Sequence, residues 1–462
     1  MLLRDTLMDY VRRSYGGSRT DPMDQPAIQN KLCQTLTLLF VHLYKDGWEN
    51  FFADFLGLTS LPNSSQKDNR WGVSLFLRIL GSIHDEIADL MITRPGNESS
   101  RNSELKDLIR ERDMANIALS WRDILAQYAA QDAEDDRIVE QVLKVLGKWV
   151  GWIDISLVIN QETLAIIMPM LGRSSPAGTD GIQVTAVETF HEIVAKKMKP
   201  ADKIDMILFL NLQQIVSELL ASPPLHEWKG TARYDTDLAE PVAKLVNTAV
   251  TDIVKVLEDE KAGNEARAKA EQLLQGFLPS LLRLFSDEYD EVCSTVIPAL
   301  TDILTFLRKL GNLPDAYSAM LPLILNAIVT KMRYDETLSW GNEDEQTDEA
   351  EFQELRKRLQ ILQKSVAAVD QNLYIDFLSN LVSKLFETLE QQGSQMDWRD
   401  LDLGLYEIYL FGELALPNAG LAHKSQPNPI AAERLAVMMS KMVESGTPLM
   451  LILFAYCFFE LC

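Results

Sequence analysis

The hydrophobic residues of this chain recur at three- and four-residue steps almost everywhere, which is the spacing of one face of an α-helix. The run from Val184 to Val194 and the run from Val296 to Leu307 show this period clearly. No sustained stretch alternates apolar and polar residues, as a half-buried strand would. Gly, Pro and Asn pairs such as Pro62-Asn63 and Pro223-Pro224 interrupt the pattern at intervals that suit antiparallel helix pairs. The pattern therefore predicts an all-α protein.

Weak internal similarity favours a solenoid over helix bundles in series. Thr179–Val194 and Tyr289–Leu304 share an acidic start followed by small and apolar residues at helical spacing, and Asp136–Leu146 follows the plan more loosely. An Asp before a Val-rich helix suits HEAT units, where the carboxylate caps the helix N-terminus. We therefore expect a right-handed superhelical solenoid of HEAT-type antiparallel helix pairs, with about ten or eleven repeats of ~40–47 residues. Another stack of helices is the alternative.

Two stretches break the helical pattern. Residues 94–103 are polar and rich in Gly, Asn and Ser, which predicts a loop. Residues 335–351 carry many acidic and few apolar side chains, which predicts an acidic insertion between helices. The insertion is read as a solvated loop, with contact to a basic partner as the alternative.

Composition narrows the range of partners. Lys and Arg total 44 against 67 Asp and Glu, a formal net charge of -23. Such a chain repels nucleic acid unless basic residues gather on one face. The four cysteines are scattered, which favours a reducing compartment. The longest apolar run, from Pro448 to Phe459, is shorter than the ~20 residues of a membrane helix, so we expect a soluble intracellular protein without membrane insertion.

The sequence gives no pattern for catalysis, metal binding or a cofactor. His191-Glu192 begins like a zinc-protease helix, but Ala195 stands where the second histidine ligand belongs. Phosphate-binding loops, dinucleotide-binding turns and nucleophile elbows are absent from the sequence. We therefore expect no catalytic residues, no metal site and no cofactor, and a protein that is not an enzyme.

Particular blocks of residues then resemble a known family. Asn30–Leu56 contains N-K-x-x-Q-T-L-T, a tyrosine and W-x-x-F-F in the order found in the exportin N-terminal homology region. There one helix is expected to face the aromatic residues of the next, Leu32, Leu36, Leu39, Phe40 and Leu43 against Trp48, Phe51, Phe52 and Phe55. Residues 145–160, with W-x-x-W-I-D, and residues 331–359, an acidic stretch before F-x-x-x-R-K-x-L, resemble exportin-T, the tRNA exportin of the importin-beta or karyopherin superfamily.

The resemblance implies a mechanism and partners. Exportins bind cargo and Ran-GTP cooperatively, so a tRNA export receptor is expected to bind tRNA and Ran-GTP, to contact nucleoporins, to act as a monomer and to shuttle between nucleus and cytoplasm. The resemblance would also place the chain in tRNA processing and export. The alternatives are a karyopherin-type receptor for a protein cargo, a plain helical-repeat scaffold, and a non-functional truncated fragment of exportin-T.

The resemblance also predicts the division of the chain. Residues 1–150 would be the exportin N-terminal homology region, incomplete at its start, and 151–446 exportin-T-like HEAT repeats with the acidic insertion. Residues 447–462 would be an atypical apolar tail. Relative to the family the chain is expected to be truncated at both ends. The missing opening repeats carry much of the family's Ran contact, so no Ran-binding residues can be assigned.

Basic clusters offer candidates for contact with tRNA. If they face inward, they could meet phosphates while the rest of the surface carries the excess acid. The alternative is that they are solvated helix ends, where positive charge is stabilised by the helix dipole. The candidate tRNA-binding residues are Lys196, Lys197, Lys199, Arg356, Lys357 and Arg358.

Overall fold

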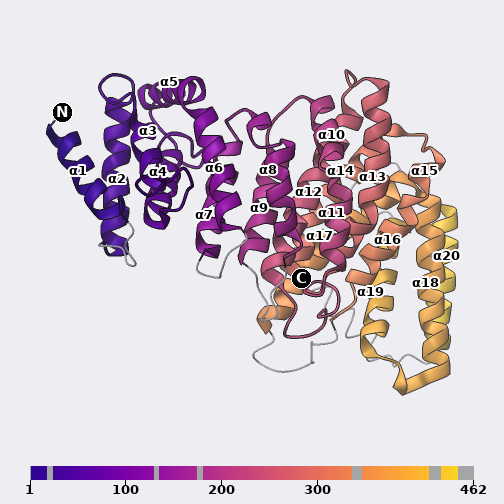
Figure 1. Cartoon of the computed structure of the whole chain (residues 1–462). Helices are drawn as coiled ribbons and strands as arrows, with labels where there is room; N and C mark the ends of the chain where they lie inside the picture. The colour runs from indigo at the N-terminus through magenta and orange to yellow at the C-terminus, as the bar shows by residue number, and fades with distance from the viewer. Residues whose placement is uncertain are drawn as a thin grey trace. The chain divides into compact units, whose positions relative to one another are not determined.

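The computed structural model describes residues 2–17, 24–129, 135–173, 181–335, 346–415 and 428–445. Every regular element within these ranges is a helix (Figure 1), which confirms the predicted all-α class. The chain divides into two compact units, Met1–Ala249 and Val250–Cys462, and helix α12 (Thr236–Glu258) passes from one to the other.

The first unit is a double layer of short antiparallel helices. Helices α2, α4, α7 and α9 pack in succession to form one layer, while α5, α6 and α8 form the other. Pairs such as α6 with α7 and α8 with α9 join the layers, as HEAT-type repeats do. The helices of this unit are α1 (Leu2–Tyr15), α2 (Pro26–Leu43), α3 (Phe51–Leu56), η1 (Gly57–Thr59), α4 (Arg70–Ile87), α5 (Gly96–Arg112), α6 (Met114–Tyr128), α7 (Asp136–Val150), η2 (Ile155–Leu157), α8 (Gln161–Leu171), α9 (Gly181–Ala195), α10 (Pro200–Phe209) and α11 (Leu212–Ala221).

The second unit repeats this plan. Helices α13, α16, α18 and α20 pack in succession, and each of α14, α17 and α19 pairs with neighbours in that layer. The predicted HEAT-type helix pairs are therefore present in both units, while the right-handed superhelix stays a prediction. The helices of this unit are α13 (Asn264–Phe285), α14 (Asp290–Leu310), α15 (Asp315–Ser318), α16 (Met320–Lys331), α17 (Gln346–Val369), α18 (Gln371–Gln392), η4 (Gly393–Gln395), α19 (Trp398–Ala415) and α20 (Pro429–Glu444).

An aromatic cluster forms the predicted core between α2 and α3. The ring of Phe40 lies 5.1 Å from that of Phe51 and 5.5 Å from that of Phe52, and Trp48 lies 4.8 Å from Phe51. All four side chains are buried. Edge-on aromatic contacts of this kind add to the stabilisation from apolar burial. The predicted packing is confirmed for Phe40 against the aromatic residues, and Leu32 and Leu36 are buried as predicted, whereas Leu39 and Leu43 are only half-buried.

Three local predictions differ from the structure. Residues 96–103 were predicted to form a loop but are helical, because α5 starts at Gly96. The first turns of α5 are polar, and its buried residues begin only at Asn102, so the sequence there does not look like a helix. Helices α7 and α14 have no side-chain cap, although the sequence predicted one; Asp136 pairs with Arg173 instead. Helix α17 begins at Gln346, inside the predicted acidic insertion 335–351. Residues 336–345 and the predicted tail 447–462 lie outside the described residues.

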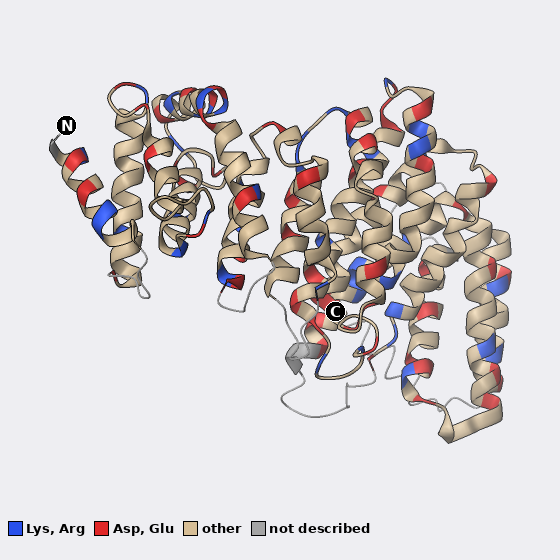
Figure 2. Cartoon of the chain, in the orientation of Figure 1, with Lys and Arg blue, Asp and Glu red and all other residues tan. Residues whose placement is uncertain are grey.

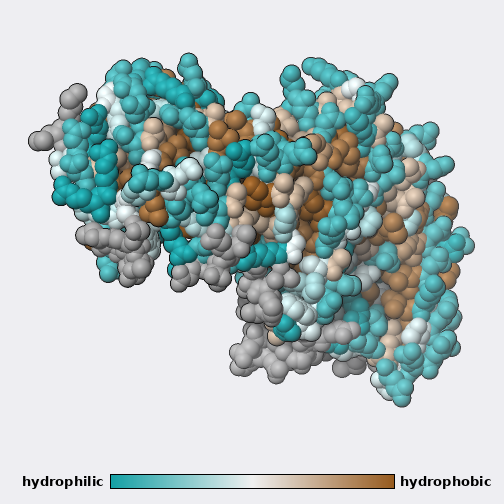
Figure 3. Space-filling model, viewed as in Figure 1, coloured by the Kyte–Doolittle hydropathy of each residue, from teal (hydrophilic) through white to brown (hydrophobic). Residues whose placement is uncertain are grey.

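Polar residues predominate on the face shown in Figure 3, with apolar patches between them. In the described part of the chain, no single helix is long and apolar enough to span a bilayer. Helices α10 and α11 meet that threshold only as a pair bent by 49°.

Candidate nucleic-acid interface

Lys196 follows the last turn of α9 and stabilises the end of a neighbouring helix. Its Nζ donates to the carbonyl oxygens of Val150 at 2.9 Å and of Ile153 at 2.8 Å, just beyond the end of α7. Burial lowers the pKa of Lys196, and Asp154 opposes that shift. A cation at the C-terminal end of a helix satisfies unpaired carbonyls and complements the helix dipole. Lys196, predicted as a candidate for contact with tRNA, therefore has its ammonium group bound by backbone carbonyl oxygens of the protein itself.

Lys197 and Lys199 are the accessible cations of this cluster. Both side chains are exposed, and Lys199 is the residue directly before α10. The backbone beneath them is fixed by Lys203, which is buried and donates to the Lys196 carbonyl at 2.6 Å and to the Val194 carbonyl. Lys196 and Lys203 thus bind backbone carbonyl groups around the connection between α9 and α10, whereas Lys197 and Lys199 are exposed.

A tryptophan pair at the end of α7 lies beside this connection. Trp149 is fully buried, with its indole N–H donating to the Leu80 carbonyl at 3.1 Å. The ring of Trp152 lies 4.7 Å from that of Trp149 and is only half-buried. Its N–H donates to Nδ1 of His84 at 3.4 Å. The W-x-x-W block thus supplies one core residue and one residue at the surface.

Arg110 of α5 lies against Trp152, one helical turn from Lys106. The Arg110 guanidinium lies 5.7 Å from the Trp152 ring centre, and its Nε donates to the Trp152 carbonyl at 2.8 Å. Burial and the nearby Arg110 lower the pKa of Lys106. Asp107 pairs with Arg110 and so offsets part of this charge. An aromatic ring can stack on a base, while an arginine or lysine beside it can pair with a phosphate.

Sequence reasoning did not find Arg110 and Lys106, because they lie about forty residues from Trp152 along the chain. The W-x-x-W-I-D block was a usable signal, but only the fold brings α5 to it.

Arg356, the first residue of the second cluster, is part of the core of the second unit. It is only 3% exposed, with Nε donating to the Met332 carbonyl at 2.9 Å and a terminal nitrogen to Asp402 at 2.5 Å. Its guanidinium lies 4.5 Å from the ring centre of Tyr334 and 4.6 Å from that of Tyr406. Such a side chain cannot reach a phosphate without leaving its partners.

The next two residues of α17 face outward. Lys357 is exposed and pairs with Glu354 at 2.7 Å, one turn away on the same helix. Arg358 is also exposed and donates to the hydroxyl of Ser294 at 3.0 Å. Because successive helix positions are about 100° apart, one basic triplet has been divided between core and surface. The accessible candidates are Lys197, Lys199, Lys357 and Arg358.

The charges of the described residues are mixed rather than sorted by sign. Figure 2 shows Lys and Arg interspersed with Asp and Glu along the helices. Many pair directly, as Lys148 does with Asp85 at 2.7 Å and Lys309 with Glu258 at 2.8 Å. Exposed pairs of this kind add little to stability but reduce the positive potential available to a phosphate. The described residues contain no group of three His, Cys, Asp or Glu side chains that could hold a metal ion.

Sequence comparison gives matches along most of the chain. The exportin-T family profile matches residues 264–451, and the profile of exportin 1-like proteins matches residues 25–190. The exportin-T of Chaetomium globosum is 70% identical over 446 residues, which are 96% of this chain and 43% of that protein. The exportin-T proteins of Neurospora crassa and Podospora anserina are 67% and 66% identical, with the same coverage of 96% and 43%. This chain thus spans less than half the length of these relatives.

Structural comparison supports the fold. The structure of importin 13 in its cytosolic state matches with a TM-score of 0.63, covering 88% of this chain and 46% of that one, at 13% sequence identity. At that identity the similarity concerns the fold alone. It agrees with the HEAT-type helix pairs of both units.

Proposed function

Because this chain belongs to the exportin-T family, we propose that it acts in nuclear export, as a receptor that binds tRNA together with Ran-GTP and carries it through the nuclear pore to the cytoplasm. The observation that carries the proposal is the 70% identity to an exportin-T over 96% of the chain. Since the chain spans 43% of that relative, the proposal concerns the part that this chain contributes to such a receptor.

The accessible cations support the choice of an anionic cargo. Lys197, Lys199, Lys357 and Arg358 project from a chain whose net charge is -23. Lys197 and Lys199 offer a local positive site in the first unit, and Lys357 and Arg358 offer one in the second, each suited to contact with phosphates. Structured RNA suits such an arrangement, because it is recognised mainly through backbone shape and phosphate contacts.

The proposed cycle requires coupling between two ligands and no catalysis by the receptor. Each ligand binds more tightly when the other has already fixed the helical array, and the coupling is the same in both directions. GTP hydrolysis on Ran would then release the cargo. In this scheme the chain works as a monomer, contacts nucleoporins without entering a membrane, and moves between nucleus and cytoplasm.

A protein cargo is the second candidate, and the charge of -23 favours it. An acidic receptor attracts basic protein segments, and the ion pairs on its helices could be exchanged for pairs with a partner. The third possibility is that this length of chain binds no cargo.

A fluorescence anisotropy titration at two salt concentrations separates these possibilities. Labelled mature tRNA and a labelled Lys/Arg-rich peptide serve as the two probes, each titrated in the presence of saturating GTP-loaded Ran. We expect the tRNA to bind, with an affinity that falls as salt rises because phosphate contacts release counterions. Binding of the peptide alone would favour a protein cargo, and binding of neither would contradict both receptor proposals for this chain.

A further inference from the structure

Gln363 of α17 and Glu407 of α19 form a buried polar pair in the second unit. Nε2 of Gln363 donates to Oε2 of Glu407 at 2.6 Å, and the two side chains are 1% and 0% exposed. The remaining oxygen of each side chain, Oε1 in both cases, is buried and has no hydrogen-bond partner. Buried polar atoms are almost always paired, so an unpaired acceptor on each member of one hydrogen-bonded pair needs an explanation.

A single proton on the carboxyl group provides one. A carboxylate only accepts hydrogen bonds, whereas a carboxylic acid has one O–H donor and one acceptor oxygen. A primary amide likewise has an N–H donor and a carbonyl acceptor. An acid and an amide can therefore form two hydrogen bonds in a ring, which leaves neither Oε1 without a partner.

We propose that Glu407 holds a proton in the folded protein and donates it to Oε1 of Gln363, so that a cyclic acid–amide pair links α17 to α19. This pair is a proton-binding site in the core of the second unit, and it is separate from the basic residues that are candidates for contact with tRNA.

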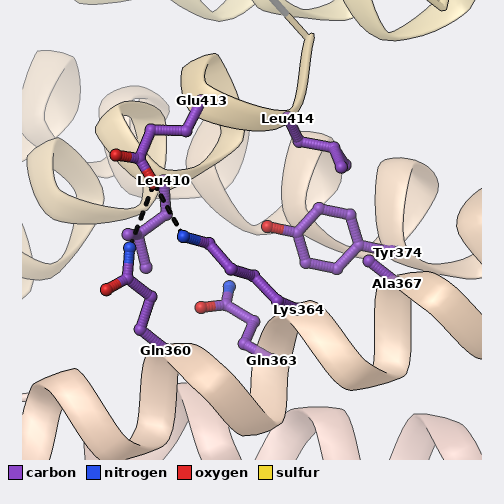
Figure 4. Close-up of a pocket in the computed structure, with 8 residues that line it drawn as sticks. All are labelled: Gln360, Gln363, Lys364, Ala367, Tyr374, Leu410, Glu413 and Leu414. Atoms are coloured by element: carbon purple, nitrogen blue, oxygen red, sulfur yellow. Dashed lines mark hydrogen bonds and ion pairs between the residues drawn. The ribbon is translucent and has the colours of Figure 1, made fainter. Parts of the chain in front are cut away.

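A cavity lies beside this pair. Figure 4 shows the cavity, of about 440 Å³, between α17, α18 and α19. Gln363 forms part of its wall, together with Gln360, Lys364, Ala367, Tyr374, Leu410, Glu413 and Leu414. Glu407 itself is 0% exposed and does not line the cavity, so its carboxyl group is shielded from water.

The charged groups around Glu407 leave its proton without strong competition. On α17, Arg356 favours the ionised form but is already paired with Asp402 at 2.5 Å, and Lys364 pairs with Glu413 at 2.9 Å. Tyr374 of α18 and Tyr406 of α19 are buried, and the pKa of each is raised by burial, so both are uncharged at neutral pH. On α20, which packs against α19, the cations pair with carboxylates of α18, Arg434 with Asp376 and Lys441 with Glu387.

Burial is the dominant influence on the carboxyl group itself. It raises the pKa of Glu407 from 4.5 to about 7, against the opposing effects of Gln363 and Arg356. Because this pKa is higher in the folded than in the unfolded state, folding takes up a proton between about pH 4.5 and pH 7. Stability from this group is therefore fully present below pH 4.5 and is lost as pH rises through about 7. The hydrogen-bonded link between α17 and α19 weakens as Glu407 ionises, around pH 7.

The test compares Glu407→Gln with Glu413→Gln in the full chain. Glu413 is the matched control, because it lies on the same helix, lines the same cavity and pairs with Lys364 as an ionised group. Infrared difference spectra at neutral pH report protonated carboxyl groups directly. We expect the wild-type minus Glu407→Gln spectrum to contain a protonated-carboxyl band, and the spectrum for Glu413→Gln to contain none.

Thermal unfolding gives the second measurement. The melting temperature of the wild type should fall by several degrees more than that of Glu407→Gln between pH 5.5 and 8, and the variant should melt higher than the wild type at pH 8. Identical pH profiles, or no protonated-carboxyl band lost with Glu407→Gln, would overturn the proposal. If Glu407→Gln does not fold, Gln363→Met serves in its place. Loss of the amide partner should shift the frequency of the protonated-carboxyl band, and an unshifted band would overturn the proposal.

Discussion

The indole N–H of Trp152 donates a hydrogen bond to Nδ1 of His84 at 3.4 Å. An accepting Nδ1 must carry a lone pair, so the imidazole is neutral with its proton on Nε2. Burial agrees with this state, because it lowers the pKa of His84 to about 4. The surface tryptophan of the W-x-x-W block is thus oriented by a histidine that stays uncharged at physiological pH.

His84 predicts acid sensitivity of the first unit. Its pKa is about 4 in the folded state and about 6.5 in the unfolded chain, so the unfolded chain binds more protons between these values. Stability from this group is present above pH 6.5 and is lost as pH falls toward 4, by about 3 kcal/mol at ~1.36 kcal/mol per unit of pKa. Urea denaturation of the wild type and of His84→Asn from pH 4 to 7 measures this. The variant should lose less stability on acidification, and parallel curves would contradict the assignment.

Replacing Arg356 should mainly destabilise the protein. Arg356→Ala leaves the Met332 carbonyl and Asp402 without their buried partner and empties the space between three aromatic rings. We expect a loss of roughly 3 kcal/mol in the free energy of unfolding. The adjacent Lys357→Ala serves as the control and should change stability by less than about 0.5 kcal/mol. Equal effects of the two changes in chemical denaturation would show that Arg356 is not part of the core.

The pair Lys196 and Lys197 gives the corresponding test in the first unit. Lys196→Ala removes the donor to the carbonyl groups beyond α7, so we expect a loss of about 1–2 kcal/mol. Lys197→Ala removes an exposed side chain and should leave stability unchanged. For tRNA affinity the order should reverse, with the larger loss for Lys197→Ala among variants that remain folded. Anisotropy titrations of both variants measure this, and weaker binding only for Lys196→Ala would oppose the placement of the interface.

Two glycines of α4 should respond oppositely to alanine. A Cβ at Gly72 would lie 1.9 Å from the Leu58 carbonyl oxygen, which is fixed by a 2.6 Å hydrogen bond from Asn69. Gly72→Ala should therefore cost at least about 2 kcal/mol. A Cβ at Gly81 meets nothing within 4 Å, so Gly81→Ala should stabilise the helix by about 0.5–1 kcal/mol. Helix α4 packs against η1, which contains Leu58, so the melting temperatures of the two variants should move in opposite directions.

Helix content and the aromatic core were predictable, because they depend on local spacing. Leu36 and Phe40 lie one turn apart, and the W-x-x-F-F residues that cover Phe40 follow within a few positions. The start of α5 was not predictable from the apolar pattern, since its first turns bury no large apolar side chain. Helices of that kind depend on packing of their later turns.

The roles of the basic residues could not be separated by sequence. Arg356 and Lys357 are adjacent and both basic, yet one is enclosed by aromatic rings from three parts of the chain and the other is exposed. Lys196 and Lys197 differ in the same way. The distinction depends on which carbonyls and rings lie nearby, and apart from Phe352 these come from residues about twenty to fifty positions away.

We propose that this chain contributes to a receptor whose tRNA and Ran-GTP sites are coupled. The most direct measurement is the Kd for labelled mature tRNA with and without saturating GTP-loaded Ran, with GDP-loaded Ran as the control. We expect Ran-GTP to tighten tRNA binding by about 5- to 150-fold, the usual range for coupled sites, and Ran-GDP to have no effect. An equal Kd under all three conditions would show that the two sites are not coupled in this chain.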